Sequence, residues 1–276
     1  MIDISKIDYS VLDRPEVLVF LFHPRPEPRS SDFSSSDLDQ LIPTERDHLI
    51  AVEEDVVIGA RFHMAEKSGC NLLFFHGNGE IVSDYDDLGP MYNQLGINLL
   101  AADYRGYGRS TGKPSVTDMM RDCHIIFDYA KTWLHQHNYP GPFILMGRSL
   151  GSASVLELAF HYQDRVDGLI VESGFAYVSP LLRLLRIDPE AVGFKEEKGF
   201  HNLKKMSRFR KPTLIIHAEF DHIIPFSDGQ ALYDTCPASE KTFLKIPGAN
   251  HNDIFMRGIS EYMAAIKKLA HQVKSC

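Results

Sequence analysis

A serine with a glycine two residues to each side is the clearest chemical signal in this chain. The residues Gly-Arg-Ser-Leu-Gly occupy positions 147–151, between an apolar run at 142–146 and an amphipathic stretch at 149–164. This pattern predicts a strand, a sharp turn and a helix, with the Ser149 hydroxyl held out beyond the end of the strand. The two glycines leave space where larger side chains would collide with neighbouring elements. N–H dipoles at the start of the helix favour negative charge beside the serine.

Ser149 needs partners, because a serine hydroxyl is a weak nucleophile at neutral pH. A histidine must take its proton, and a carboxylate must orient that histidine. Asp221 follows the apolar run at 213–217, and His251 follows the last such run, at 242–246. Each of the three residues therefore comes just after a predicted strand, and we expect Ser149, Asp221 and His251 to form a triad.

Other side chains could take two of these roles. Glu172 follows the preceding apolar run and is the main alternative for the acid. His217 and His222 are less suited than His251 to act as the base, because they lie on the strand or loop of Asp221 itself.

Acyl transfer also requires two donors for the oxyanion of the tetrahedral intermediate. The N–H of Leu150, directly after the serine, is the first candidate. The second is the N–H of Asn78, in the loop His-Gly-Asn-Gly at 76–79, whose glycines allow the backbone to approach a substrate closely. Taken alone, this loop could also be a plain strand-to-helix turn.

The elements that must position these residues alternate along the chain. A hairpin at about 49–64 precedes them, and the clearest helix has apolar residues spaced by three and four from 116 to 134. Short apolar runs between turn signals predict strands buried on both faces. These runs lie at 71–75, 97–103, 142–146, 168–171, 213–217 and 242–246. We therefore predict an α/β fold with a doubly wound, mostly parallel sheet of about eight strands, and a site at their carboxyl ends.

Two segments interrupt this alternation. Residues 1–47 are irregular and rich in proline and serine, and we interpret them as an N-terminal arm before a single domain at 48–276. About forty residues separate the fourth and fifth apolar runs, which is longer than a usual connection. We interpret positions 174–210 as a small helical cap in which Leu181 and Leu185 bind the substrate. The alternative is that these leucines only pack on the sheet.

Composition narrows the class of protein. The chain has 276 residues, 44% of them hydrophobic, and a net charge of −8, which disfavours nucleic-acid or anionic-membrane partners. Its four cysteines lie far apart without a CxxC motif, so we expect reduced thiols, no zinc site and no cofactor.

The longest early apolar run, at 17–22, is far short of the ~20 residues that span a bilayer. We expect a cytoplasmic protein without a signal peptide or transmembrane segment; the oligomeric state is left open.

From about residue 48 to the end, the chain resembles an α/β-hydrolase. Five motifs carry the resemblance: His-Gly-Asn-Gly at 76–79, Asp-Tyr-Arg-Gly-Tyr-Gly at 103–108, the serine motif at 147–151, Asp-His-Ile-Ile-Pro at 221–225 and Gly-Ala-Asn-His at 248–251. The chain is most similar to the compact, small-lid esterase branch that includes protein depalmitoylases. The resemblance implies the same triad and the same oxyanion donors. Because we find neither an N-terminal anchor nor a cysteine cluster for lipidation, we do not expect a membrane-bound depalmitoylase.

We therefore expect a serine hydrolase that cleaves carboxylic ester or thioester bonds of a small-molecule substrate through an acyl-serine intermediate. A serine peptidase or amidase on the same triad is the alternative, since this fold hosts all these activities. A non-catalytic binding protein is a third possibility, disfavoured because all three triad residues are present. A serine rather than an aspartate at position 149 disfavours haloalkane dehalogenation.

Overall fold

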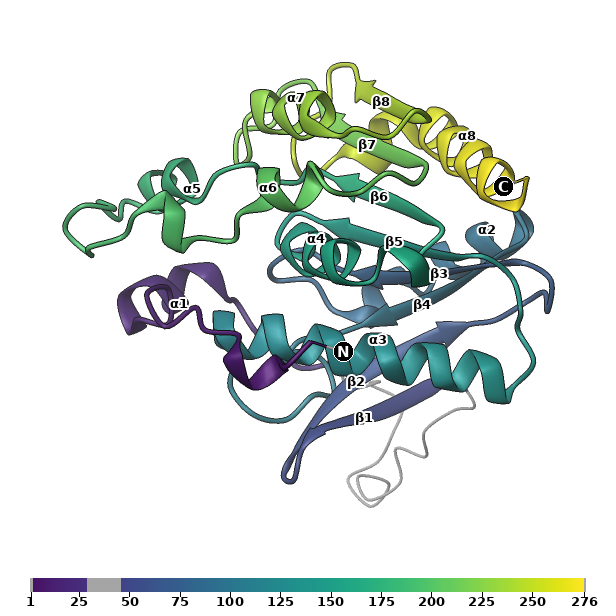
Figure 1. The fold of residues 1–276 in the computed structure, drawn as a ribbon, viewed down its shortest axis with the longest axis horizontal. Coiled ribbons are helices and arrows are strands. Elements are labelled where there is room, and N and C mark those ends of the chain that lie inside the picture. Colours follow the sequence, from purple (N-terminus) through teal and green to yellow (C-terminus); the bar gives the residue numbers. More distant parts are fainter. Residues whose placement is uncertain (1, 29–45, 276) are drawn as a thin grey trace.

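The structure is a computed structural model that describes residues 2–28 and 46–275 (Figure 1). The stretch of the expected N-terminal arm at 29–45 lies outside the described residues, as do Met1 and Cys276. The described chain folds around an eight-stranded sheet with the strand order β1-β2-β4-β3-β5-β6-β7-β8. The strands are β1 Asp47–Glu53, β2 Val56–His63, β3 Cys70–Phe75, β4 Ile97–Ala102, β5 Phe143–Arg148, β6 Gly168–Glu172, β7 Thr213–Ala218 and β8 Lys241–Ile246.

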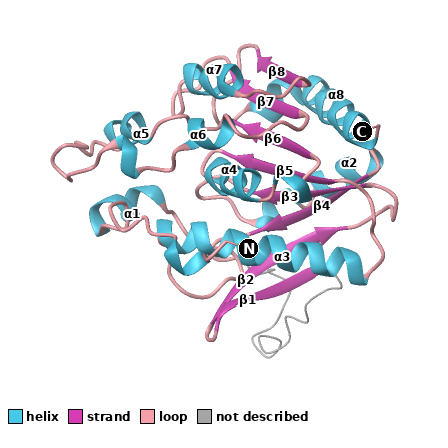
Figure 2. Cartoon of the chain, viewed as in Figure 1, coloured by secondary structure: helices cyan, strands magenta, loops and turns pink. Residues whose placement is uncertain are grey.

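The sheet is mostly parallel. Strands β1 and β2 form an antiparallel hairpin, and β2 also pairs antiparallel with β4. Every other pair of neighbouring strands is parallel. Figure 2 shows the strands with helices on both faces. The prediction of a doubly wound, mostly parallel sheet of about eight strands is confirmed.

Each face of the sheet is covered by its own set of helices. Successive side chains of a strand point to opposite faces, so Leu73 and Phe75 of β3 join one core cluster, and Leu72 and Phe74 join the other. Helices α3, α4 and α7 contribute to the first cluster, and α2 and α8 to the second. Their bounds are α2 Leu88–Gln94, α3 Val116–Gln136, α4 Gly151–His161, α7 Phe226–Thr235 and α8 Ile254–Lys274.

The strand order reverses direction at β3. The chain passes from β3 to β4 on one side, and then returns to β5 on the other side of β3. Phe75 at the end of β3 lies opposite Gly147 of β5. The loops at 76–79 and 147–151 therefore leave the sheet side by side, in the crevice where open α/β sheets bind ligands.

Two further segments lie beyond the carboxyl ends of the central strands. Helix α1, Pro15–Leu21, begins with proline at its first position, which suits a helix start, and buries Val17 and Leu21. This helix was not predicted, because the sequence analysis treated the segment as irregular. The long connection after β6 holds α5, Val178–Leu184, and α6, Asn202–Met206. In Figure 1, α1 and α5 project at the same end of the molecule. The division into an arm, a domain and a cap remains a prediction.

Candidate active site

Ser149 occupies a sharp turn between β5 and α4. Its φ of +51° lies in the left-handed region, which a residue with a side chain rarely adopts. Its N–H donates to the carbonyl oxygen of Glu172 at 2.8 Å. A Cβ at Gly147 would collide with the backbone of Gly151, and a Cβ at Gly151 would collide with the carbonyl oxygen of Phe75. The two glycines thus allow strand, turn and helix to pack at this distance, which holds the strained serine in place.

The three expected triad residues form one hydrogen-bonded chain. His251 Nε2 lies 3.1 Å from Ser149 Oγ, and His251 Nδ1 lies 2.7 Å from Asp221 Oδ2. The other carboxylate oxygen, Asp221 Oδ1, accepts the N–H groups of Ile223 at 3.0 Å and Ile224 at 2.8 Å. A carboxylate can only accept, so Nδ1 donates to Asp221, and neutral Nε2 is left to accept the serine proton.

The surroundings of Asp221 favour its charged form. Burial alone would raise its pKa, but the hydrogen bond from His251 and the two backbone donors outweigh burial and hold the pKa of Asp221 below its ordinary value. An ionised carboxylate in this position can offset the positive charge that His251 gains when it takes a proton.

The alternative residues are engaged elsewhere. The carboxylate of Glu172 binds Arg148 at 2.7 Å and accepts the hydroxyl of Tyr262 at 2.7 Å. His217 Nε2 donates to the carbonyl oxygen of Ile224 at 3.0 Å, and His222 is exposed. The structure brings His251, rather than these histidines, to Ser149.

The two expected oxyanion donors line the same cavity as Ser149 and His251. The Asn78 side chain turns to the N-terminal segment: its Oδ1 accepts the N–H of His23 at 2.8 Å and the hydroxyl of Tyr107 at 2.7 Å. Within the described chain, the N–H groups of Asn78 and Leu150 donate to no other residue. Both remain available to an oxygen bound beside the serine.

The cavity at Ser149 has a volume of about 280 Å³ and largely apolar walls. Leu181 and Leu185, the expected substrate-binding residues, lie in it together with Leu184. Phe20 and Leu21 of α1 also line this cavity, although the sequence pattern did not predict them as site residues. The signal was present in the apolar run at 17–22, which was considered only as a membrane span.

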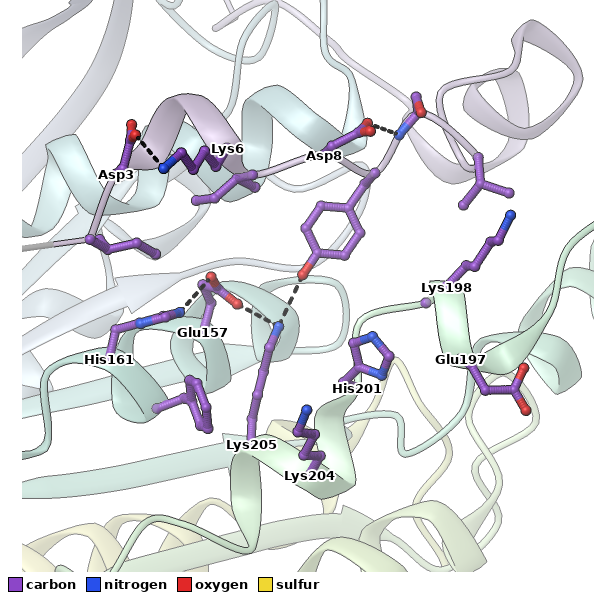
Figure 3. A pocket seen from close by; sticks show the side chains of 17 residues that line it. Asp3, Lys6, Asp8, Glu157, His161, Glu197, Lys198, His201, Lys204 and Lys205 are labelled. Atoms are coloured by element: carbon purple, nitrogen blue, oxygen red, sulfur yellow. Dashed lines mark hydrogen bonds and ion pairs between the residues drawn. The ribbon is translucent and has the colours of Figure 1, made fainter.

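A second hollow, of about 820 Å³, lies between residues 2–11, the end of α4 and residues 197–205 (Figure 3). Its buried charges are paired with one another. Lys205 Nζ lies 2.6 Å from Glu157 and 3.2 Å from the hydroxyl of Tyr9, and His161 lies 3.2 Å from Glu157. These contacts join the N-terminal segment and α6 to the helix that begins beside Ser149.

Three features of residues 2–28 and 46–275 concern metal binding, membrane insertion and the state of the thiols. No group of three or more His, Cys, Asp or Glu side chains is arranged to hold a metal ion. No helix in this part of the chain is long and apolar enough to cross a bilayer. Cys70, Cys123 and Cys236 are free, buried thiols.

Known proteins resemble this chain in sequence over most of its length. Residues 67–191 match the family described as serine aminopeptidase, S33. The mouse alpha/beta hydrolase domain-containing protein 17C is 32% identical over 215 residues, an alignment that covers 76% of this chain and 62% of the mouse protein. The alpha/beta hydrolase domain-containing protein aho-3 of Caenorhabditis elegans is 34% identical over 66% of this chain and 52% of its own length. This chain therefore spans less than two thirds of the length of these relatives.

Solved structures share the fold. Est1E of Butyrivibrio proteoclasticus, solved with ferulic acid bound, superposes with a TM-score of 0.65 at 19% identity, over 82% of this chain and 99% of that one. The monoacylglycerol lipase of Paleococcus ferrophilus has a TM-score of 0.62 at 21% identity, over 78% of this chain and 99% of that one. The chain therefore belongs to the α/β-hydrolase superfamily, because the sequence similarities, the strand order and the serine turn agree with one another.

Proposed function

We propose that this protein is a serine hydrolase that cleaves carboxylic ester or thioester bonds through an acyl-serine intermediate. The observation that carries the proposal is the chain of hydrogen bonds from Asp221 through His251 to Ser149, which ends in an apolar cavity. Membership of a hydrolase superfamily supports it.

The proposed reaction follows from these contacts. His251 Nε2 takes the proton of Ser149 as Oγ bonds to the acyl carbon, and the N–H groups of Asn78 and Leu150 hold the resulting oxyanion. The imidazolium, offset by Asp221, then gives its proton to the leaving alcohol or thiol as that bond breaks. In the second half, His251 takes a proton from water, the hydroxide attacks the acyl-serine, and Ser149 regains its proton as the acid departs.

The walls of the cavity favour an acyl or aryl group. Leu181, Leu185 and Phe20 present apolar surface beside the serine, and each methylene buried there contributes about 0.8 kcal/mol to binding. Two structural neighbours, Est1E solved with ferulic acid bound and a monoacylglycerol lipase, are consistent with such substrates.

A peptidase or amidase on the same residues is the alternative, and the name of the matching family favours it. An aminopeptidase needs an acidic group for the substrate's ammonium. Glu80 is the carboxylate that lines this cavity, but Arg148, the N–H of Gly77 and the hydroxyl of Tyr85 already bind it. We therefore place esters and thioesters first.

A substrate panel tests the proposal. The purified protein is assayed with p-nitrophenyl esters, acyl-CoA thioesters and aminoacyl anilides, together with Ser149→Ala. Ser154→Ala is the matched control, because Ser154 is a buried serine on α4, the helix that follows Ser149, and lies outside the cavity. We expect ester or thioester turnover that falls at least ~10³-fold in Ser149→Ala and is kept in Ser154→Ala. Faster turnover of anilides would favour the peptidase, and no turnover of any class would favour a binding protein.

We also propose a cytoplasmic location and a small-molecule substrate as the main partner. The free thiols of Cys70, Cys123 and Cys236 support a reducing compartment. A tagged full-length protein found in the secretory pathway by cell fractionation would contradict this location.

A further inference from the structure

Arg148, the residue before the serine, lines the cavity of the candidate active site. It is buried, and three of its nitrogens have separate partners. Nε donates to Glu80 Oε1 at 2.8 Å, Nη1 donates to Glu172 Oε1 at 2.7 Å, and Nη2 donates to the carbonyl oxygen of His251 at 3.0 Å. One planar guanidinium thus joins three segments that are far apart in the sequence.

The first partner leads to the expected oxyanion donor. While Glu80 Oε1 accepts from Arg148, Glu80 Oε2 accepts the N–H of Gly77 at 2.7 Å and the hydroxyl of Tyr85 at 2.6 Å. Gly77 directly precedes Asn78. The position of the Asn78 N–H is therefore coupled to Arg148 through one carboxylate.

The second partner leads back to the serine. Glu172 accepts Arg148 on Oε1 and the hydroxyl of Tyr262 on Oε2, and its backbone carbonyl accepts the N–H of Ser149 at 2.8 Å. The third partner is the backbone of the expected base, His251. All three functional loops are thus fixed to the same side chain.

The charges in this cluster are complementary. Burial would raise the pKa of Glu80, but the positive charge of Arg148 and the hydrogen bonds it receives lower it to about 2. Glu80 is therefore ionised at neutral pH and keeps its contact with the guanidinium. A lysine in place of Arg148 could not serve the three partners, because an ammonium lacks the planar fork of donors.

We propose that Arg148 is a positioning residue, which sets the spacing between the oxyanion donor at Asn78, the base His251 and the nucleophile Ser149. This inference rests on the proposed function. An arginine that only stabilised the fold would affect unfolding but not the affinity for a transition-state mimic. A positioning arginine affects that affinity in protein that remains folded.

The test compares Arg148→Met and Arg148→Lys with a matched control, Arg105→Met. Arg105 is similarly buried and binds Asp122 at 2.7 Å and Glu53 at 2.8 Å, but it does not line the cavity. Folded active sites are counted by fluorophosphonate titration. For each variant we measure kcat and KM with p-nitrophenyl butyrate, and the inhibition constant of an alkyl trifluoromethyl ketone, whose adduct places an oxyanion between the two donors.

In both Arg148 variants we expect kcat per active site to fall roughly 10- to 100-fold, since small displacements of reacting groups have effects of this size. We expect KM to stay within about threefold, and the ketone to bind correspondingly more weakly, because the lost interaction acts on the transition state. Arg105→Met should keep all three constants within about threefold of wild type, even if it unfolds more easily.

The possible outcomes separate an error in this inference from an error in the proposed function. If wild type hydrolyses the ester and both Arg148 variants keep kcat and ketone affinity within about threefold of it, this inference is wrong and the proposed function stands. If Arg105→Met loses ketone affinity as strongly as Arg148→Met, the effect is one of stability and the inference is also wrong. If Arg148→Met does not fold, Arg148→Lys and Glu80→Gln carry the same comparison. Glutamine has one acceptor oxygen where the carboxylate has two, so it cannot accept Arg148 and Gly77 on separate oxygens. A wild type without turnover or labelling would instead overturn the proposed function.

Discussion

Ser149 is held in a conformation that its neighbours impose. Its positive φ is fixed by the N–H bond to Glu172 and by the tight approach of Gly147 and Gly151. The sequence predicted this turn because glycine spacing and flanking apolar runs are local signals. It favoured Asp221 as the acid but left Glu172 as an alternative, since both follow buried strands. What separates them is tertiary contact: Glu172 is bound by Arg148, whereas Asp221 meets His251.

At the scale of single residues, Asp221→Asn tests the orienting acid. An asparagine amide at position 221 holds the tautomer of His251 less well than the carboxylate does. It also offsets less of the positive charge on the imidazolium of His251. We expect kcat to fall on the order of 10³- to 10⁴-fold with little change in KM, measured on a p-nitrophenyl ester. An Asn variant within tenfold of wild type would show that another group orients His251.

Tyr107→Phe tests the support of the oxyanion loop. The hydroxyl of Tyr107 donates to Asn78 Oδ1 at 2.7 Å and accepts the N–H of His23. A net hydrogen bond contributes about 0.5–1.5 kcal/mol, so we expect kcat to fall about 2- to 10-fold. Tyr129→Phe, which removes a hydroxyl that contacts His48 instead, should leave kcat unchanged. Equal effects of the two substitutions would refute a specific role for the Tyr107 contact.

At the scale of elements, two short helices contribute apolar residues to the lining of the cavity. Helix α5 was anticipated as part of a cap because the connection after β6 is long. Helix α1 was not, because it is seven residues long and the prolines and serines that follow it made the whole segment look irregular. A short helix is stabilised by what it packs against rather than by its own sequence, and the partners of α1 are remote in the chain.

Substitutions in the wall formed around α5 test its part in substrate choice. Leu181→Trp and Leu185→Trp should fill part of the cavity and shift preference toward short acyl esters, at about 1–3 kcal/mol per methylene excluded. The profile of kcat/KM against chain length measures this shift. Leu49→Trp, at an exposed position on β1, serves as control. If all three variants share the wild-type profile, the leucines only pack on the fold.

At the scale of the whole molecule, the alternation of strands and helices followed from periodicity alone. The strand order did not, because pairing β3 between β4 and β5 depends on contacts between distant segments. The same holds for the cluster of Tyr9, Glu157 and Lys205, which joins three regions of the chain (Figure 3). Single polar residues in a helix or arm give no sequence signal of such pairing.

That cluster makes stability depend on pH. Burial would raise the pKa of Glu157, but contacts with His124, His161 and Lys205 lower it below its ordinary value. A carboxyl with a lowered folded-state pKa stabilises the fold above its unfolded pKa, and this contribution is lost as pH falls through the folded value. Glu157→Gln should therefore destabilise the protein at pH 7, by about 3–5 kcal/mol for a broken buried pair.

The difference in unfolding free energy between wild type and Glu157→Gln should shrink as the pH falls below about 4, where carboxyl groups of the unfolded chain become protonated. Urea unfolding at a series of pH values measures it. A difference that stays constant from pH 7 to acid would contradict an ionised Glu157 in the folded protein.

The central claim is that Ser149 is an activated nucleophile, and covalent labelling tests it most directly. Wild type and Ser149→Ala are treated with a fluorophosphonate, digested, and analysed by mass spectrometry. We predict a single adduct on the peptide that contains Ser149, formed within minutes in wild type and absent from Ser149→Ala. An adduct on another residue, or folded wild-type protein that stays unlabelled, would contradict the account.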